Sequence, residues 1–261
     1  MPLYLYSFQP DIGRLTRLAQ REKVLPPGDD LGYAIHAIFA ATFGHHAPKP
    51  FAFLAPGPGG GGPNGRLFAY ASQPREILFA HAEMFADPAF SSTLDLRHAP
   101  EPKCMPDDFP VGTRLGFRVR LRPVIRTGGR RLDATHPDTP AQKARERDVF
   151  LARVDATTAA GNSPAPRAAC YVDWLGVQLA GMGARLEQGR VDAFRFTRLL
   201  TRGRGAAAGR SRRYVDGPDA VAMGTLKVTD TKEFAAGLAR GVGRLRAFGF
   251  GMLLLSPPRD D

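Results

Sequence analysis

The chain has few cysteines and no long hydrophobic run, and each absence excludes a class of protein. Its 261 residues include two cysteines, Cys104 and Cys170. Two thiols cannot form a four-thiolate zinc site, and one possible bridge is no disulfide framework. No apolar stretch reaches the roughly 18 residues that a membrane span needs, and residues 1–10 lack the pattern of a secretory signal. We therefore expect a soluble intracellular protein of the cytoplasm that has no membrane partner.

Motifs for metal ligands and activated nucleophiles are missing as well. The sequence contains no His-x-x-x-His, Glu-x-x-His or Asp-x-Asp cluster, no Gly-Lys-Ser/Thr phosphate loop and no Gly-x-Ser-x-Gly element. His45 and His46 are neighbours that could not easily ligate one metal together, and His81, His98 and His136 have no carboxylate or cysteine at ligand spacing. We therefore expect no metal, no cofactor, and neither a serine nor a cysteine hydrolase.

Positive charge is concentrated in two segments of the chain. Lys and Arg together number 36 against 25 Asp and Glu, a net charge of +11. Residues 109–132 and 193–215 each hold seven arginines, with no lysine and no acidic residue. Arginine pairs phosphate oxygens in a bidentate fashion and stacks on bases, so these segments favour binding of a nucleic-acid backbone over a solvated surface. This signal does not separate RNA from DNA.

The order of the expected elements occurs twice along the chain, which is 43% hydrophobic and can bury a sizeable core. Periodicity in the first half predicts a strand, a helix, two strands and a helix at residues 2–8, 31–43, 51–54, 66–71 and 73–85, with loops at 56–63 and 86–108. In the second half it predicts a strand, two helices, two strands, a helix and a strand at residues 113–125, 142–153, 169–184, 190–200, 221–228, 229–240 and 252–255. We therefore expect an α+β fold of tandem ferredoxin-like (RRM-like) domains, β-α-β-β-α-β each, over residues 1–104 and 109–261.

The strand expected at residues 113–125 has two different faces. Alternate residues on one side are apolar, namely Leu115, Phe117, Val119 and Leu121. The residues on the other side are Arg114, Gly116, Arg118, Arg120 and Arg122. Because side chains of a strand alternate between its faces, one face is expected in the core and the other to form a row of guanidinium groups.

A glycine-rich segment precedes the last expected strand. Two Gly-hydrophobic-Gly triplets, at Gly241 and Gly243 and at Gly249 and Gly251, are separated by five residues that include Arg244 and Arg246. Glycine lets a backbone lie close to a partner, and exposed N–H groups together with arginines could hold phosphates. A tight connection from helix to strand is the alternative for this C-terminal glycine-rich loop.

Residues 222–257 resemble the C-terminal signature of the CRISPR repeat-processing endoribonucleases, in particular the CasE family of the type I-E Cascade systems. The two glycine triplets and the Arg-Ala-Phe-Gly before the last of them carry the resemblance, which extends along the whole chain. The resemblance implies a metal-independent antiviral-defence nuclease that cuts CRISPR repeat stem-loop RNA into guides. It also implies that the protein keeps the mature crRNA and joins the other Cascade subunits. A non-catalytic RNA-binding scaffold subunit of that complex is the alternative.

The resemblance also implies which residues act. Tyr33 and His36 are three residues apart on one expected helix, so they share a face. A lone histidine between Ile35 and Ile38 is more often structural, but the pair lies where the family carries its catalytic Tyr-x-x-His. Residues 202–213 resemble the family's basic hairpin, which would follow the phosphates of an A-form stem. The expected RNA-binding residues are Arg114, Arg118, Arg120, Arg198, Arg202, Arg204, Arg210, Arg212, Arg213, Arg244 and Arg246.

Overall fold

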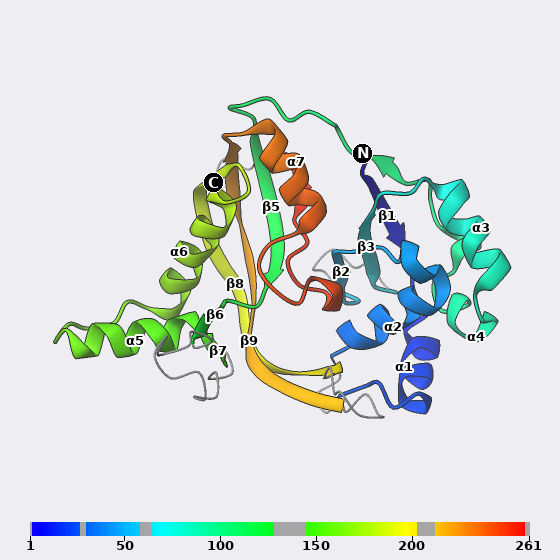
Figure 1. Ribbon diagram of the computed structural model, residues 1–261, viewed down its shortest axis with the longest axis horizontal. Coiled ribbons are helices and arrows are strands. Elements are labelled where there is room, and N and C mark those ends of the chain that lie inside the picture. The colour runs from blue at the N-terminus through cyan, green and yellow to red at the C-terminus, as the bar shows by residue number, and fades with distance from the viewer. Residues whose placement is uncertain (1, 27–29, 58–63, 128–144, 203–211, 259–261) are drawn as a thin grey trace, which may run out of the picture.

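The computed structural model describes residues 2–26, 30–57, 64–127, 145–202 and 212–258 (Figure 1). Two of the expected RNA-binding residues, Arg204 and Arg210, lie outside these ranges, as do residues 58–63 of the expected glycine-proline loop. None of the helices in the described ranges combines the length and the apolar character that crossing a bilayer demands.

The first half of the chain forms a four-stranded antiparallel sheet. Its strands are β1 (Tyr4–Phe8), β2 (Phe51–Leu54), β3 (Arg66–Ala71) and β4 (Lys103–Cys104), in the order β2-β3-β1-β4. The helices α1 (Ile12–Arg21) and α2 (Gly32–Phe43) connect β1 to β2, and α3 (Arg75–Phe85) and α4 (Pro88–Ser91) connect β3 to β4. Since β3 lies between the two strands of a β-α-β unit, this is the split arrangement of a ferredoxin-like domain.

The second half repeats this arrangement. Its sheet has the order β10-β5-β9-β8, with strands β5 (Arg114–Leu121), β8 (Ala184–Arg202), β9 (Arg212–Val228) and β10 (Leu254–Ser256). The crossing helices are α6 (Arg167–Ala180) and α7 (Thr231–Arg240). A ribbon of β6 (Val124–Thr127) and β7 (Arg145–Asp148), followed by α5 (Val149–Ala159), is inserted after β5. The prediction of tandem ferredoxin-like folds is confirmed.

The two halves pack against each other through residues that cross between their cores. The apolar face of β5, with Phe117 and Val119, is buried in the second core together with Trp174. Leu200, near the end of β8, lies in the first core, because the β8–β9 ribbon curves across below α2 toward α1 (Figure 1). The Tyr70 hydroxyl of β3 donates a hydrogen bond to the Leu253 carbonyl at 3.1 Å. These contacts fix α2 beside the C-terminal segment.

The structure differs from the expected elements at four places. Helix α1 is an addition to them; Asp11 caps it by accepting a hydrogen bond from the Arg14 N–H at 2.9 Å. The helix expected at 142–153 is confirmed at residues 149–153, which begin α5, but residues 145–148 form strand β7. The strand expected at 113–125 is interrupted after Leu121, because Pro123 has no N–H for a sheet ladder. Helix α4 and strand β4 lie within the loop expected at 86–108.

Candidate active site

The beginning of helix α2 is held against the C-terminal segment. The Asp30 carboxylate accepts a hydrogen bond at 2.9 Å from the N–H of Gly32, the first residue of the helix. A Cβ at Gly32 would lie 2.3 Å from the carbonyl oxygen of Phe248, so only glycine permits this approach. Phe248 belongs to the short 3-10 turn η3 (Arg246–Phe248) between the glycine triplets. The helix with the expected catalytic pair therefore starts on the glycine-rich segment.

Tyr33, His36 and Phe248 form one aromatic cluster at this contact. The ring of Phe248 lies parallel to that of Tyr33 with centroids 5.7 Å apart and meets that of His36 edge-on at 5.0 Å. The Tyr33 and His36 centroids are 6.1 Å apart. Tyr33 is 6% exposed, and His36 is half-buried. The structure thus brings the two expected catalytic residues together and adds Phe248, which sequence reasoning missed although Phe248 stands within the glycine motif.

The glycine-rich segment after α7 is a closed turn of backbone. Gly241, Gly243, Gly249 and Gly251 all have positive φ. The Val242 N–H donates to the Gly251 carbonyl at 2.8 Å, and the Gly251 N–H donates to the Arg120 carbonyl at 2.7 Å. A Cβ at Gly251 would lie 2.1 Å from the Val242 carbonyl oxygen. Close backbone packing is thus sufficient reason for glycine at position 251, in agreement with the alternative of a tight helix-to-strand connection.

Arg120 links the two halves through a buried ion-pair network. Its guanidinium donates to both Asp219 oxygens, at 2.8 and 2.7 Å, and to Asp30 at 2.5 Å. It also lies 4.2 Å from the ring centroid of Phe250. Burial disfavours its charge, but the hydrogen bonds and charges of Asp219 and Asp30 outweigh burial and raise the pKa of Arg120. Since Asp30 also binds the N–H of Gly32 at the start of α2, Arg120 positions the helix that carries Tyr33 and His36.

Arg122 is turned into the protein rather than toward solvent. It is 1% exposed and donates to the Val215 carbonyl at 3.0 Å and the Thr197 hydroxyl at 3.3 Å. Burial lowers the pKa of Arg122. The expected row of exposed guanidinium groups is therefore wrong at Arg120 and Arg122, because the first pairs with buried carboxylates and the second fastens the β8–β9 ribbon to β5.

Four of the other expected RNA-binding arginines, Arg114, Arg198, Arg244 and Arg246, make contacts near the surface. Arg114 pairs with Glu187 at 2.8 Å, Arg198 with Asp216 at 2.8 Å and Arg244 with Glu146 at 2.6 Å. Arg246 donates to the Arg240 carbonyl at 2.9 Å.

Half-buried Arg118 lines a cleft of about 660 Å³ between the halves. Backbone pairing places Arg202 opposite Arg212 and Thr201 opposite Arg213. Ion pairs near the surface contribute little free energy, so an RNA phosphate can displace Glu187, Asp216 or Glu146 from its arginine.

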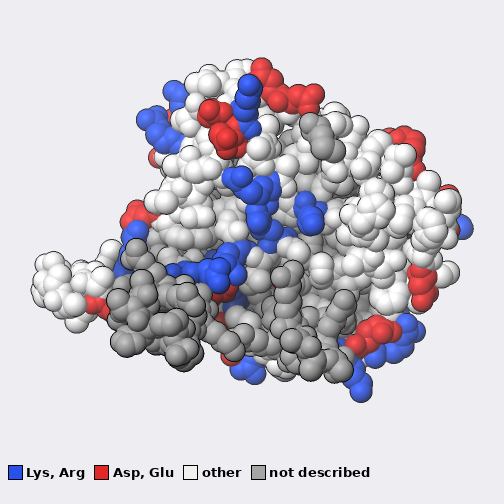
Figure 2. All heavy atoms as spheres, viewed as in Figure 1, with Lys and Arg blue, Asp and Glu red and all other residues white. Residues whose placement is uncertain are grey.

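Basic side chains collect in the middle of one face, over the second sheet and its loops, whereas the part over α3 and α4 carries few charges (Figure 2).

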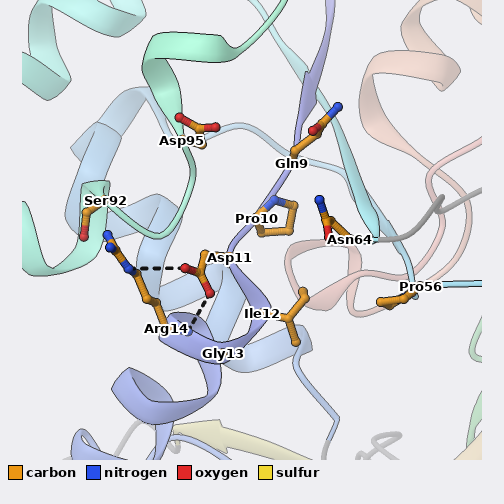
Figure 3. A pocket seen from close by; sticks show the side chains of 10 residues that line it. All are labelled: Gln9, Pro10, Asp11, Ile12, Gly13, Arg14, Pro56, Asn64, Ser92 and Asp95. Atoms are coloured by element: carbon orange, nitrogen blue, oxygen red, sulfur yellow. Dashed lines mark hydrogen bonds and ion pairs between the residues drawn. The ribbon is translucent and has the colours of Figure 1, made fainter.

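A depression of about 570 Å³ at the start of α1 has acidic residues in its lining. Asp11 and Asp95 line it, and Asp11 pairs with Arg14 at 3.2 Å (Figure 3). Its two carboxylates disfavour a phosphate backbone there.

A histidine cluster unforeseen from the sequence forms where α2 ends against α3. The ring centroids of His45 and His46 are 3.7 Å apart, and His81 lies 5.7 and 5.5 Å from them. Burial and the neighbouring His45 and His81 lower the pKa of His46. No group of three or more His, Cys, Asp or Glu side chains in the described ranges could hold a metal ion.

The lowered pKa of His46 predicts a pH-dependent stability. The folded state binds the His46 proton less well than the unfolded chain, so stability falls as the pH drops below the ordinary histidine pKa of about 6.5. Between about pH 7.5 and about pH 5.5, the melting temperature of the wild type should fall further than that of His46→Asn. Thermal denaturation at the two pH values measures this difference. If the melting temperatures of wild type and His46→Asn fell equally, the lowered pKa of His46 would be contradicted.

A family model matches nearly the whole chain. The sequence matches the family model described as CRISPR associated protein over residues 3–257. The chain belongs to the CRISPR-associated protein family. No curated protein sequence matches it.

Solved structures share the fold of this CRISPR-associated protein. A CRISPR endoribonuclease Cse3 bound to a 19-nucleotide RNA matches with a TM-score of 0.60 and 20% identity, covering 98% of this chain and 100% of that one. Thermus thermophilus Cse3, bound to an RNA that represents a pre-cleavage complex, gives the same values of 0.60, 20%, 98% and 100%. Cas6e from Escherichia coli K-12 matches with a TM-score of 0.53 and 18% identity, covering 98% and 100%. These likenesses agree with the tandem ferredoxin-like fold.

Proposed function

We propose that this CRISPR-associated protein is a metal-independent endoribonuclease that cuts CRISPR repeat stem-loop RNA into guide RNAs. The packing of Tyr33, His36 and Phe248 at the junction of α2 with the glycine-rich segment carries the proposal. The Cse3 structures support it, because one is described as a CRISPR endoribonuclease bound to RNA and another as a pre-cleavage complex. The cleaved guide stays bound, and the protein acts as a subunit of the Cascade complex.

The proposed reaction transfers a phosphoryl group within the RNA. The 2′-hydroxyl oxygen bonds to the adjacent phosphorus while the bond from phosphorus to the 5′-oxygen of the next nucleotide breaks. One group takes the 2′-hydroxyl proton, and another gives a proton to the leaving oxygen. His36 can serve in either role near neutral pH, Tyr33 hydrogen-bonds the 2′-hydroxyl or the phosphate, and an arginine stabilises the extra negative charge.

The β8–β9 ribbon is the proposed binding element for the RNA stem. Arg198 stands on β8, and the paired backbone brings Arg202, Arg212 and Arg213 to the far end of the ribbon. The Arg198 and Asp216 side chains are 49% and 61% exposed, so their pair exchanges readily with phosphate. The major groove of an A-form stem is too narrow for routine readout, so these residues follow shape and phosphate register.

Metal independence predicts the outcome of cleavage in a chelator. Labelled repeat RNA from the same locus should be cut in EDTA at the rate seen without it, because both proton transfers are assigned to side chains. The products should carry a 2′,3′-cyclic phosphate or 3′-phosphate and a 5′-hydroxyl, which end-specific enzymatic labelling measures. A strict requirement for Mg²⁺ would reject this mechanism.

The proposed ribbon contacts predict a change in salt dependence. Affinity for RNA falls as salt rises, and each phosphate contact makes the fall steeper. Replacing Arg198, Arg212 or Arg213 with alanine, one at a time, should make the slope of log affinity against log salt shallower by about one unit per lost contact. Arg14→Ala is the matched control, because Arg14 pairs with Asp11 at the acidic depression and should leave the slope unchanged. If double Arg→Ala variants keep the wild-type slope, the stem binds elsewhere, and the exposed part of β5 near Arg114 and Arg118 is the next candidate.

A further inference from the structure

A cavity of about 510 Å³ opens between α1, α2 and α4, directly beside Tyr33 and His36. Much of its wall is apolar, with Leu18, Val24 and Phe90 among the residues that line it. Phe248 lines it too, so the cavity meets the aromatic cluster that includes His36. A group bound there would lie next to Tyr33 and His36, the expected catalytic side chains.

The charge of the lining residues limits what the cavity can take. Glu22 is among the lining residues, with a side chain that is 41% exposed, and no Lys or Arg is among the described residues of the wall. A phosphate needs cations or clustered N–H donors, so the sugar-phosphate backbone cannot enter. A flat, uncharged group that carries N–H donors does fit, because an apolar wall desolvates its faces and a carboxylate accepts from its edge.

A nucleobase has these properties. Unpaired RNA bases are bound by stacking on aromatic side chains and by hydrogen bonds to their edges. Carboxylates accept hydrogen bonds from exocyclic amino groups of bases. Phe248 supplies an aromatic ring, and Glu22 supplies the acceptor. Glu22 also accepts from the Arg21 guanidinium at 3.1 Å, and a carboxylate has lone pairs for further donors.

We propose that this cavity, the base pocket, holds the flipped-out base of one nucleotide that flanks the bond to be cut. Glu22 accepts a hydrogen bond from the amino group of that base, and Phe248 contacts its ring. The inference rests on the proposed function and adds a specificity site to it. Turning one base out of the stack also turns the backbone, which helps to bring the 2′-hydroxyl in line with the phosphorus.

The first test removes either the pocket or the base. Ala37 lines the pocket, so Ala37→Phe fills it, and Ala80→Phe makes the same change at an exposed position of α3 that does not line it. Wild type and Ala80→Phe should cut RNA with an abasic nucleotide at one flanking position about tenfold more slowly than intact RNA, the scale of losing one stacked base. Ala37→Phe should cut both RNAs at the same reduced rate.

The second test does not depend on cleavage. A repeat RNA with a 2′-deoxy group at the cut position and 2-aminopurine as the flanking base is bound by each protein. Acrylamide should quench 2-aminopurine several-fold less in the wild-type complex than in the Ala37→Phe complex. Equal quenching in the two complexes would overturn the base pocket.

The two tests separate this inference from the proposed function. If wild type cuts intact and abasic RNA equally fast at both flanking positions, the base pocket is wrong and the endoribonuclease stands. If wild type protects 2-aminopurine but cuts no RNA, the base pocket stands and the protein is a non-catalytic RNA binder.

Discussion

Replacing His36 with alanine is expected to slow cleavage of repeat RNA by about a hundredfold or more, the usual scale for losing a general acid or base. The parallel contact between Tyr33 and Phe248 does not involve the His36 ring and should remain. RNA affinity should change little, because the proposed stem contacts are on the β8–β9 ribbon. Single-turnover cleavage at saturating protein measures the rate, and a separate titration measures the affinity.

His98→Ala is the matched control for this loss. His98 lies in the 3-10 turn η2 (Leu96–His98), is exposed and pairs with Asp95 at 2.8 Å, away from the aromatic cluster. This variant should cut RNA at the wild-type rate. If His36→Ala also did so, His36 would be a structural residue, and the non-catalytic scaffold would become the better explanation of the fold.

Replacing Arg120 with methionine is expected to cost about 3–5 kcal/mol of the free energy of unfolding, because it removes one partner of a buried ion-pair network. Without the Arg120 guanidinium, Asp30 (5% exposed) loses this partner, and Asp219 (3% exposed) keeps only Arg195, whose side chain is 63% exposed. Burial favours the protonated form of Asp219, but Arg120 and Arg195 outweigh burial and lower its pKa. With Arg120 removed, Asp219 should take up a proton more readily, so the loss of unfolding free energy relative to wild type should shrink as the pH falls toward about 4. Urea denaturation at several pH values measures the effect.

Arg198→Met separates this effect from the loss of any ion pair. Arg198 also pairs with an aspartate of β9, but both partners are exposed. The variant should lose far less stability than Arg120→Met, because solvent screens exposed pairs. Equal losses in the two variants, or a loss in Arg120→Met that does not change with pH, would contradict the positioning role of Arg120.

Local sequence patterns predicted several strands and helices of the fold. Strands β2 and β3 have their expected bounds, because each is a short apolar run and the glycine-proline tract between them marks where β2 ends and β3 can begin. Helix α7 begins two residues after its expected start, because Asp230 caps it by accepting from the Glu233 N–H at 2.9 Å. Helix α1 was missed although Leu15, Leu18 and Ala19 give it a buried stripe at helical spacing.

Contacts between distant segments could not be derived from one sequence. Strand alternation put Arg122 in a row of guanidinium groups outside the core, but the Val215 carbonyl of the ribbon accepts its hydrogen bond inside the protein. Nothing local indicates that Asp30 meets Arg120, or that Phe248 reaches Tyr33 across 215 positions of chain. Helical spacing put Tyr33 and His36 on one face, and the family resemblance, not the spacing, marked them as the catalytic pair. The partners around the pair depend on how the two halves pack.

The central claim, cleavage by 2′-hydroxyl attack, is tested most directly by single-turnover cleavage of two end-labelled repeat RNAs. One is all-RNA, and the other has a single 2′-deoxy nucleotide at the position mapped as the cut. The wild-type protein should bind both RNAs with similar affinity, cut the first in EDTA and leave the second intact. Cleavage of the 2′-deoxy RNA at that bond, or binding without cleavage of the all-RNA substrate, would contradict the account.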